Sequence, residues 1–355
     1  MKSLVLYVAL IFGVLTAFGQ KIPETSLYIL HQPFVNPASV SKYGSMSGAF
    51  SFKQQWVGYE GAPQSLFANF NMPLKRDRTA GGLISNDKLG IHNTFKIQGL
   101  YAQKFRIDRT SFFSLAVTPG IDLLQNDYAA VQTDYANDPL FSGNSVSMFS
   151  VNMGAGGYYY AKKLYAGIAI PEFFYNHFEA VNPGENKGKL TLNLKNMPLY
   201  FMGGWKTDVG KFITLKPSSM VRYQPGSALQ VDVTCLAEYR EQIGFGITYR
   251  TLNSLNFIAS YQINRDFKVG YGYNTQLGSQ LNTYNSGTHE IGLMFGTGNM
   301  KRSNVNLPKK IKKYKKAKLK EIQKAMKATE KERKKKDKDA VPLEPGGKRK
   351  KQPYR

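Results

Sequence analysis

The segment Gly244-Phe245-Gly246-Ile247-Thr248-Tyr249-Arg250 decides the fold, because two kinds of side chain alternate along it. Apolar and aromatic residues take every second position, and glycine, threonine and arginine take the positions between them. Successive side chains of a β-strand point to opposite faces of the sheet, so the segment predicts a strand with one apolar and one polar face. The same alternation recurs at 113–118, 267–274 and 290–295.

The recurrence of such segments predicts an all-β fold, a transmembrane outer-membrane antiparallel β-barrel of about 14 strands over residues 46–297. A soluble β-sandwich also alternates. The barrel is favoured because the apolar face is rich in aromatic residues, the other face is small or polar, and no convincing helix intervenes. We expect long polar loops at 124–145 and 173–197, and strands at 46–57, 65–72, 80–86, 92–105, 110–123, 146–159, 163–172, 198–206, 211–223, 228–239, 242–250, 255–263, 267–275 and 287–297.

The N-terminus has the pattern of a secretory signal peptide at residues 1–19. Lys2 precedes an apolar core from Leu4 to Leu15, which is shorter than the roughly 20 residues of a bilayer-spanning helix. Ala17 and Gly19 place small residues where signal peptidase requires them. We therefore expect an exported chain that begins with a periplasmic N-terminal segment at 20–45.

The net charge of +24 is concentrated in a C-terminal tail at 298–355. Residues 301–355 contain 23 Lys or Arg and 6 Asp or Glu. Apolar residues at 311, 314, 319, 322 and 326 fall on one helical stripe after Pro308, so the tail is predicted to be partly helical and otherwise disordered. We expect this tail in the periplasm.

One interpretation of the tail is a solvated, mostly disordered extension. The other is electrostatic binding to lipid headgroups, to peptidoglycan or to an acidic periplasmic protein. A run of basic residues usually binds nucleic acid, but an exported chain is separated from the nucleic acid of the cytoplasm, so we expect no nucleic-acid partner. The candidate residues for an anionic surface are Lys309, Lys310, Lys312, Lys313, Lys315, Lys316, Lys334, Lys335, Lys336, Lys348, Arg349, Lys350 and Lys351.

Several short motifs occur in an order that resembles the PorP/SprF family of outer-membrane proteins. The segment His31–Ala38 resembles the family's opening Asn-Pro-Ala box, and Gln54–Pro63 resembles its Gln-Trp-x-Gly-aromatic-acid-Gly-Ala-Pro pattern. Shorter matches lie at 86–90, 216–218, 249–250, 270–273 and 287–291. The basic tail departs from the pattern, because many relatives end after the last strand.

The resemblance implies a non-enzymatic component of the type IX secretion and gliding machinery of Bacteroidota. Such a barrel would support export or surface attachment of an adhesin-like substrate by docking partner proteins of the machinery, with outer-membrane lipid around it. The docking candidates are Trp56, Gly58, Tyr59, Gly61 and Pro63, for which a structural turn with Trp56 as an interface anchor is the simpler interpretation. The alternative function is a passive porin or uptake channel, which needs an open lumen.

The sequence contains no recognisable catalytic, metal or cofactor site. His31, His92 and His177 have no metal-ligand spacing, and no phosphate-binding loop or nucleophile elbow occurs. His289 and Glu290 are adjacent in a predicted strand, so their side chains face opposite sides and cannot form a dyad. The single cysteine, Cys235, is expected to be a small strand residue. We therefore expect no enzymatic activity.

Overall fold

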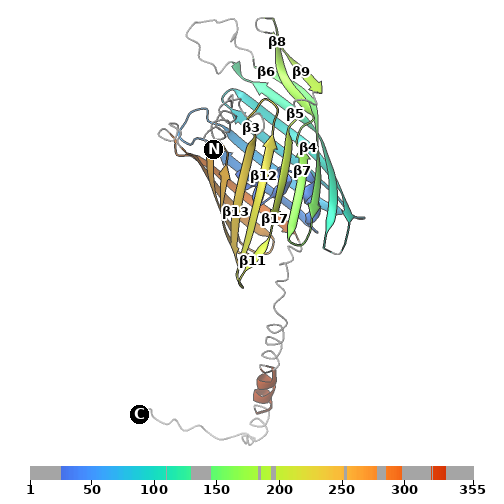
Figure 1. Ribbon diagram of the computed structural model, residues 1–355, viewed down its shortest axis with the longest axis vertical. Coiled ribbons are helices and arrows are strands. Elements are labelled where there is room, and N and C mark those ends of the chain that lie inside the picture. Colours follow the sequence, from blue (N-terminus) through green and yellow to red (C-terminus); the bar gives the residue numbers. More distant parts are fainter. Residues whose placement is uncertain are drawn as a thin grey trace, which may run out of the picture. The chain divides into compact units, whose positions relative to one another are not determined.

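The structure is a computed structural model that describes residues 25–108, 110–128, 145–182, 185–192, 197–251, 254–277, 285–297, 321 and 323–332 (Figure 1). The predicted strands are present, with bounds that mostly shift by a residue or two. They are β1 (Met46–Gln54), β2 (Gln64–Leu74), β3 (Arg78–Leu89), β4 (His92–Arg106), β5 (Phe112–Asn126), β6 (Val146–Tyr160), β7 (Leu164–Ile170), β10 (Leu199–Trp205), β11 (Thr207–Val209), β12 (Ile213–Tyr223), β13 (Gln230–Tyr239), β14 (Ile243–Arg250), β15 (Ser254–Gln262), β16 (Phe267–Gln276) and β17 (Thr288–Thr297).

The sheet closes on itself, because the first strand pairs with the last. β1 pairs antiparallel with both β2 and β17, and β10 joins β7 to β12. β10 and β11 both pair with β12 and are separated by one residue, Lys206, so they are two parts of one strand. The ring therefore contains the predicted 14 antiparallel strands. Closure leaves no sheet edge exposed to lipid, as a membrane requires.

The two faces of the wall follow the alternation in the sequence. On β14, Phe245 points outward and is 66% exposed, whereas Gly246 and Thr248 are buried on the inner face. An outer wall of exposed apolar side chains suits hydrocarbon and not water. Other exposed outer residues are Phe50, Phe70, Ile97, Tyr101, Val117, Phe149, Ile168, Phe201, Val233, Phe257 and Ile291. Buried polar residues include Ser51, Asn69, Asn71, Ser114, Asp122, Asn152, Asp232, Thr234, Glu238, Asn256 and Glu290.

The two ends of the barrel differ in the length of their connections. One end has short turns at 75–77, 107–111, 161–163, 210–212, 240–242 and 263–266, and β1 begins and β17 ends there, with Met46 paired to Thr297. Consecutive residues with positive φ, Arg76 with Asp77 and Arg240 with Glu241, shape two of these turns as in tight hairpins. The opposite end has the four longest connections, at 55–63, 127–145, 171–198 and 277–287, together with shorter ones at 90–91, 224–229 and 251–253. In bacterial barrels the short turns face the periplasm.

A hairpin occupies most of the region 173–197, where a loop was expected. β8 (Phe174–Asn182) and β9 (Glu185–Leu192) pair with each other in a separate two-stranded sheet, which extends beyond the barrel at the long-loop end (Figure 1). A hairpin outside the membrane needs no lipid-facing apolar row, so its sequence lacks the alternation that marks the barrel strands. The predicted loop at 124–145 begins later, because β5 continues to Asn126.

The tail forms a separate unit, residues 301–355. Residues 321 and 323–332 are helical and exposed, and Met326 on the predicted stripe is 69% exposed. The other stripe residues, Ile311, Tyr314, Leu319 and Ile322, lie outside the described residues, as do the tail lysines named as binding candidates. Among the described helices, none is long and apolar enough to cross a membrane.

Candidate functional site: the plugged lumen

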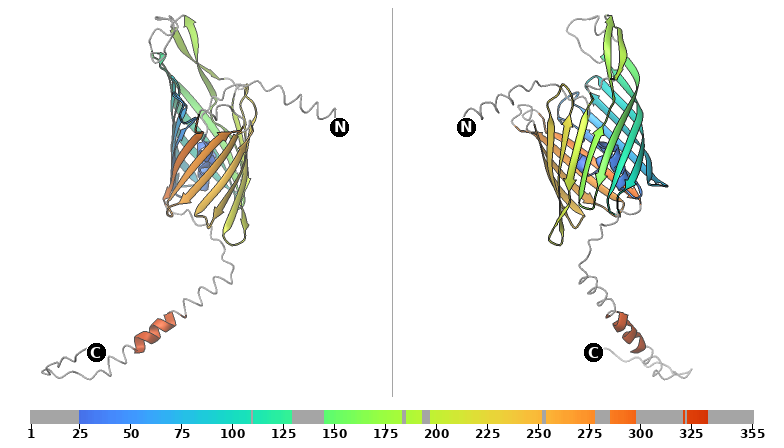
Figure 2. Two further views of the ribbon diagram at one scale, coloured as in Figure 1. Left: turned by 90° about the vertical axis from the view of Figure 1, so that its left-hand side faces the viewer. Right: turned by 45° about the vertical axis from the view of Figure 1, so that its right-hand side comes forward.

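The segment from Thr25 to Tyr43, which we call the plug, lies inside the barrel (Figure 2). It consists of three short 3-10 helices, η1 (Ser26–Ile29), η2 (Gln32–Phe34) and η3 (Pro37–Lys42). Prolines stand in the first turns of η2 and η3, where a fixed φ helps and a missing N–H is harmless. The segment belongs to residues 20–45, for which a periplasmic location was expected, and from Thr25 onward it packs against the inner wall.

A buried carboxylate holds the N-terminal end of the plug. Glu290 on β17 is 1% exposed and receives a hydrogen bond from the Thr25 hydroxyl. The backbone N–H of Ser26 donates to its other oxygen at 2.6 Å, and the Ser51 hydroxyl on β1 donates at 2.6 Å. Three donors converge on this one buried side chain, so Glu290 is a strong anchor for the plug.

Asn36 holds the middle of the plug against two strands at once. Its Nδ2 donates to the carbonyl oxygens of Gly157 on β6 at 3.1 Å and Ile168 on β7 at 3.2 Å. Its Oδ1 accepts from the backbone N–H of Ala38 at 3.0 Å, which caps η3. The Asn-Pro-Ala motif of the sequence is therefore a docking element, with the asparagine serving both the cap and the wall.

Further contacts fix the plug on other sides of the lumen. The His31 imidazole hydrogen-bonds to Oδ1 of Asn69 on β2 at 2.9 Å, and the Ser41 hydroxyl lies 2.6 Å from that of Ser114 on β5. Burial of His31 lowers its pKa to about 3, so the ring is neutral when the plug is docked. The Tyr28 hydroxyl lies 3.4 Å from that of Thr234 on β13.

Glycines on the inner wall make room for the plug. A Cβ atom on Gly167 would lie 2.6 Å from Nδ2 of Asn36, and one on Gly292 would lie 2.7 Å from Leu27. A Cβ atom on Gly270 would lie 2.6 Å from Leu30. The wall is thus shaped to this segment, and larger side chains at these positions would displace it.

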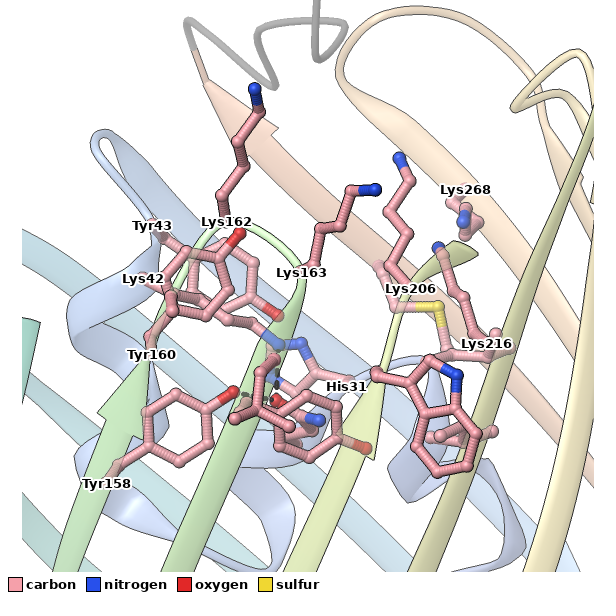
Figure 3. Close-up of a pocket in the computed structure, with 18 of the residues that line it drawn as sticks. His31, Lys42, Tyr43, Tyr158, Tyr160, Lys162, Lys163, Lys206, Lys216 and Lys268 are labelled. Carbon is pink, nitrogen blue, oxygen red and sulfur yellow. Dashed lines mark hydrogen bonds between the residues drawn. The ribbon is translucent and has the colours of Figure 1, made fainter. Parts of the chain in front are cut away.

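A cavity of about 310 Å³ remains beside the plug (Figure 3). We call it the lysine cavity, because its walls include six lysines. It lies among the strand ends at the short-turn end, since the turn 161–163 and residues near the end of β10 and the starts of β12 and β16 line it. The lysines are Lys42, Lys162, Lys163, Lys206, Lys216 and Lys268.

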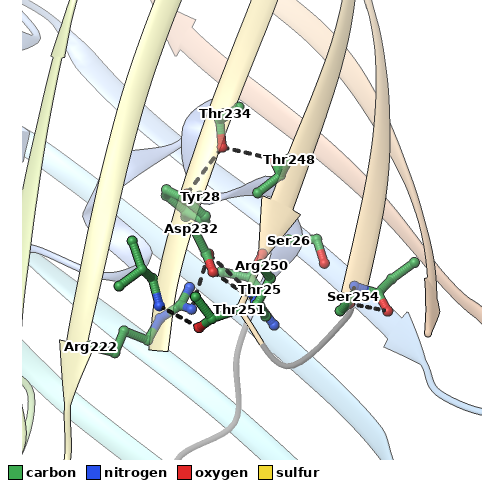
Figure 4. A network of polar contacts seen from close by, with 12 residues as sticks. Thr25, Ser26, Tyr28, Arg222, Asp232, Thr234, Thr248, Arg250, Thr251 and Ser254 are labelled. Carbon is green, nitrogen blue, oxygen red and sulfur yellow. Dashed lines mark hydrogen bonds and ion pairs between the residues drawn. The ribbon is translucent and has the colours of Figure 1, made fainter. Parts of the chain in front are cut away.

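Two arginines share one carboxylate elsewhere in the lumen (Figure 4). Arg250 on β14 binds both oxygens of Asp232 on β13, at 2.8 and 3.0 Å, and Arg222 on β12 lies 3.0 Å from the same carboxylate. The Arg222 guanidinium also lies 5.6 Å from the ring centre of Tyr28 in the plug. The cluster joins three adjacent strands and holds Arg222 against the ring of Tyr28 in the plug.

The residues predicted for partner docking lie together in the β1–β2 loop at the long-loop end. Trp56, Gly58 and Gly61 have positive φ values of 44°, 104° and 70°, and Tyr59 is 52% exposed. Pro63 is buried where β2 begins. Backbone hydrogen bonds tie the loop to neighbouring connections, from Val57 N–H to the Gly287 carbonyl at 3.0 Å and from Gly90 N–H to the Gly61 carbonyl at 3.1 Å. The loop is therefore a shaped surface on the rim.

The histidines do not assemble a catalytic or metal site in the described part of the chain. His289 packs on Tyr271 and Tyr273, while its neighbour Glu290 anchors the plug inside, so the two side chains are separated as expected. His92 hydrogen-bonds to Asn126, and the side chain of His177 lies outside the described residues. No group of three or more potential metal ligands occurs among the residues described. Cys235 is exposed on β13.

The fold and the lumen define the class as an outer-membrane β-barrel that contains its own N-terminal segment. Residues 17–295 match the family model described as type IX secretion system membrane protein PorP/SprF. The chain belongs to this family. The matched region includes the plug and excludes the basic tail. No curated protein sequence matched the chain.

Solved structures that are similar to this chain include a hydrocarbon channel, a toluene transporter and a FadL homologue. The CymD monoaromatic hydrocarbon channel has a TM-score of 0.46 at 11% identity and covers 79% of this chain and 95% of its own. The toluene transporter TodX of P. putida scores 0.43 at 8% identity, covering 75% and 93%. A FadL homologue of Pseudomonas aeruginosa scores 0.42 at 10% identity, covering 79% and 96%.

Proposed function

We propose that this barrel supports export or surface attachment of an adhesin-like substrate of type IX secretion by docking partner proteins. Membership of the family supports a role in the secretion machinery. The observation that favours docking over conduction is the plug, which is hydrogen-bonded to β17 through Glu290 and to β6 and β7 through Asn36. A lumen built around a fitted segment suits a scaffold better than a porin, whose channel is open to water.

The rim loop at 55–63 is the docking surface we propose for the substrate or for a machinery protein. It belongs to the long-loop end, which faces outward in bacterial barrels. It presents an exposed tyrosine, Tyr59, and a half-buried tryptophan, Trp56, and both residue types are common in binding hot spots. The hydrogen bonds to neighbouring loops keep its backbone in place, which lowers the entropic cost of binding.

Deletion of the gene is expected to abolish surface display of the adhesin-like substrate, measured by blotting intact cells. Complementation with the full chain should restore display, and complementation with Trp56→Ala/Tyr59→Ala should restore it only in part. Tyr223→Ala is the matched control, because this exposed tyrosine lies at the same end of the barrel outside the rim loop. Unchanged display and motility after the deletion would contradict the proposed function.

We propose a periplasmic location for the basic tail, where it ties the barrel to an anionic surface or an acidic partner. β17 ends at the short-turn end of the barrel, and the tail follows it in the sequence. The net positive charge of residues 301–355 suits a long-range, salt-dependent attraction.

Removal of residues 301–355 is expected to leave a folded barrel and to weaken co-purification with envelope components. Raising the salt concentration should weaken co-purification of the full chain in the same way, because ions screen the attraction. The control is a tail with every lysine replaced by arginine, which keeps the charge and should keep the interaction. Equal recovery of envelope components with the truncated and the full chain would show that the tail has no such role.

A further inference from the structure

The lysine cavity has far more positive than negative charge. Lys216 lies 2.6 Å and Lys268 lies 3.3 Å from the same carboxylate, Glu238, so these two lysines share one counter-charge. Lys206 lies 3.2 Å from Glu241. The remaining three lysines of the cavity have no carboxylate partner in the part of the chain that the structure describes.

These three lysines differ in their surroundings. Lys162 and Lys163 are exposed on the turn between β6 and β7. Lys42, in the plug, donates to Gln32 at 2.7 Å and lies 5.0 Å from the ring centre of Tyr43. Burial, together with Lys216 and Lys268, lowers the pKa of Lys42 to about 7. An anion at this position would relieve the repulsion among the lysines.

Apart from His31 and Gln32, the rest of the cavity wall is aromatic and aliphatic. Tyr43, Tyr158 and Tyr160 stand among the lysines (Figure 3), and Tyr165 and Trp205 also line the cavity. Leu164 and Met294 add apolar surface. Among the described residues no arginine lines the cavity, although arginine gives the two-pronged geometry that dedicated phosphate sites favour. Separate lysine charges beside apolar surface suit several carboxylates on a flexible chain that also has apolar parts.

We propose that the lysine cavity is a docking site for an acidic peptide segment of a partner protein on the short-turn side of the barrel. The chain's own tail is unsuited to it, because residues 301–355 are strongly basic and the lysines would repel them. One or two side chains of a peptide segment can enter the cavity, while its other carboxylates interact with the exposed Lys162 and Lys163. The site is separate from the rim loop, and it does not depend on which substrate is exported.

The test uses the purified full-length protein in detergent and follows fluorescence from Trp205. The chain has 2 tryptophans, so Trp56→Phe leaves Trp205 as the only reporter. Because Trp205 lines the cavity, its fluorescence reports on binding there. The probes are hexaglutamate, a neutral glycine-serine peptide of the same length, inorganic phosphate and a short-chain phosphatidylglycerol.

Hexaglutamate is expected to change the fluorescence saturably, and Lys162→Glu/Lys163→Glu should weaken its binding by about tenfold. Lys75→Glu/Lys211→Glu is the matched control, because it makes the same charge change in two other turns at the same end and should leave binding unchanged. Lys162→Gln/Lys163→Gln, which removes charge without reversing it, should give a smaller loss.

Three results would overturn the proposal. The first is no fluorescence change with hexaglutamate, or the same change with the neutral peptide. The second is equal weakening by the Lys162/Lys163 variant and the Lys75/Lys211 variant, which would mean that only net charge matters. The third is stronger binding of phosphate or phosphatidylglycerol than of hexaglutamate, which would assign the cavity to a phosphate group instead of a peptide.

Discussion

Removal of the plug, residues 25–43, is expected to convert a barrel that conducts no measurable ion current into an open channel. The plug contacts strands around the lumen, with hydrogen bonds to β2, β5, β6, β7 and β17. Without it, the inner wall of Ser, Thr, Asn, Asp and Glu side chains would hold water, as in porins. Single-barrel recordings in planar bilayers would measure the change.

Point variants test the same prediction with the plug still in the chain. Asn36→Ala removes the cap of η3 and two hydrogen bonds to the wall, at a cost of roughly 3 kcal/mol of docking free energy. Glu290→Gln replaces one of the two accepting oxygens by an amide nitrogen, which cannot accept a hydrogen bond, at a cost of about 2 kcal/mol. Together they should produce frequent channel openings in an otherwise intact barrel.

The matched control is Asn264→Ala/Glu60→Gln. Asn264 accepts hydrogen bonds within the β15–β16 turn, and Glu60 is exposed in the β1–β2 loop, so neither residue holds the plug. This control should stay silent. A silent barrel after deletion of the plug would show that something else closes the lumen. Steady conduction by the unmodified protein would favour the porin function.

The wall of the barrel was predictable because its signal is local. Lipid on one side and a polar lumen on the other impose a period of two on each strand, and residues 243–250 show it within a single segment. The predicted strand at 198–206 ends at the break, so its continuation as β11 was missed, because three residues are too few to show an alternation. The β8–β9 hairpin was missed because it lies outside the membrane and has no lipid-facing row.

The plug and the lysine cavity were not predictable in the same way, since their contacts connect distant parts of the chain. Thr25 and Glu290 are 265 residues apart, and Asn36 and Gly157 are 121 residues apart. The available signal was the dense set of prolines and polar residues in His31–Ala38, which is unusual for a segment free in solvent. The cavity lysines are scattered in the sequence from 42 to 268, whereas the lysines of the tail form one dense run.

Acidification is expected to release the plug through His31. Docking lowers the pKa of this imidazole to about 3 by burial, whereas the free segment should titrate near the usual value of 6.5. Between these pH values the released segment binds one more proton than the docked one, so lowering the pH favours release. Above pH 6.5 the ring is neutral in both states and contributes no pH dependence.

The docking free energy is expected to fall by about 1.6 kcal/mol between pH 6.5 and pH 5, which is roughly sixteenfold in the equilibrium constant. Lys42 also makes docking less favourable as the pH falls, but only between its usual pKa of 10.5 and its docked pKa of about 7. It therefore does not affect the change between pH 6.5 and pH 5. Ser39→Cys in a Cys235→Ala background gives the measurement, because Ser39 is fully buried and a thiol-specific reagent can reach it only after release.

His31→Gln is expected to flatten the pH dependence of thiol labelling, because glutamine can still hydrogen-bond to Asn69 and does not titrate. The control is His289→Gln, since His289 packs on Tyr271 and is not among the residues that hold the plug. Thiol labelling of the His289→Gln protein should accelerate in acid as in the parent protein. If the His31→Gln protein also releases its plug between pH 6.5 and pH 5, a different group drives the release. In that case the neutral, buried imidazole would be a packing residue and not the source of acid sensitivity.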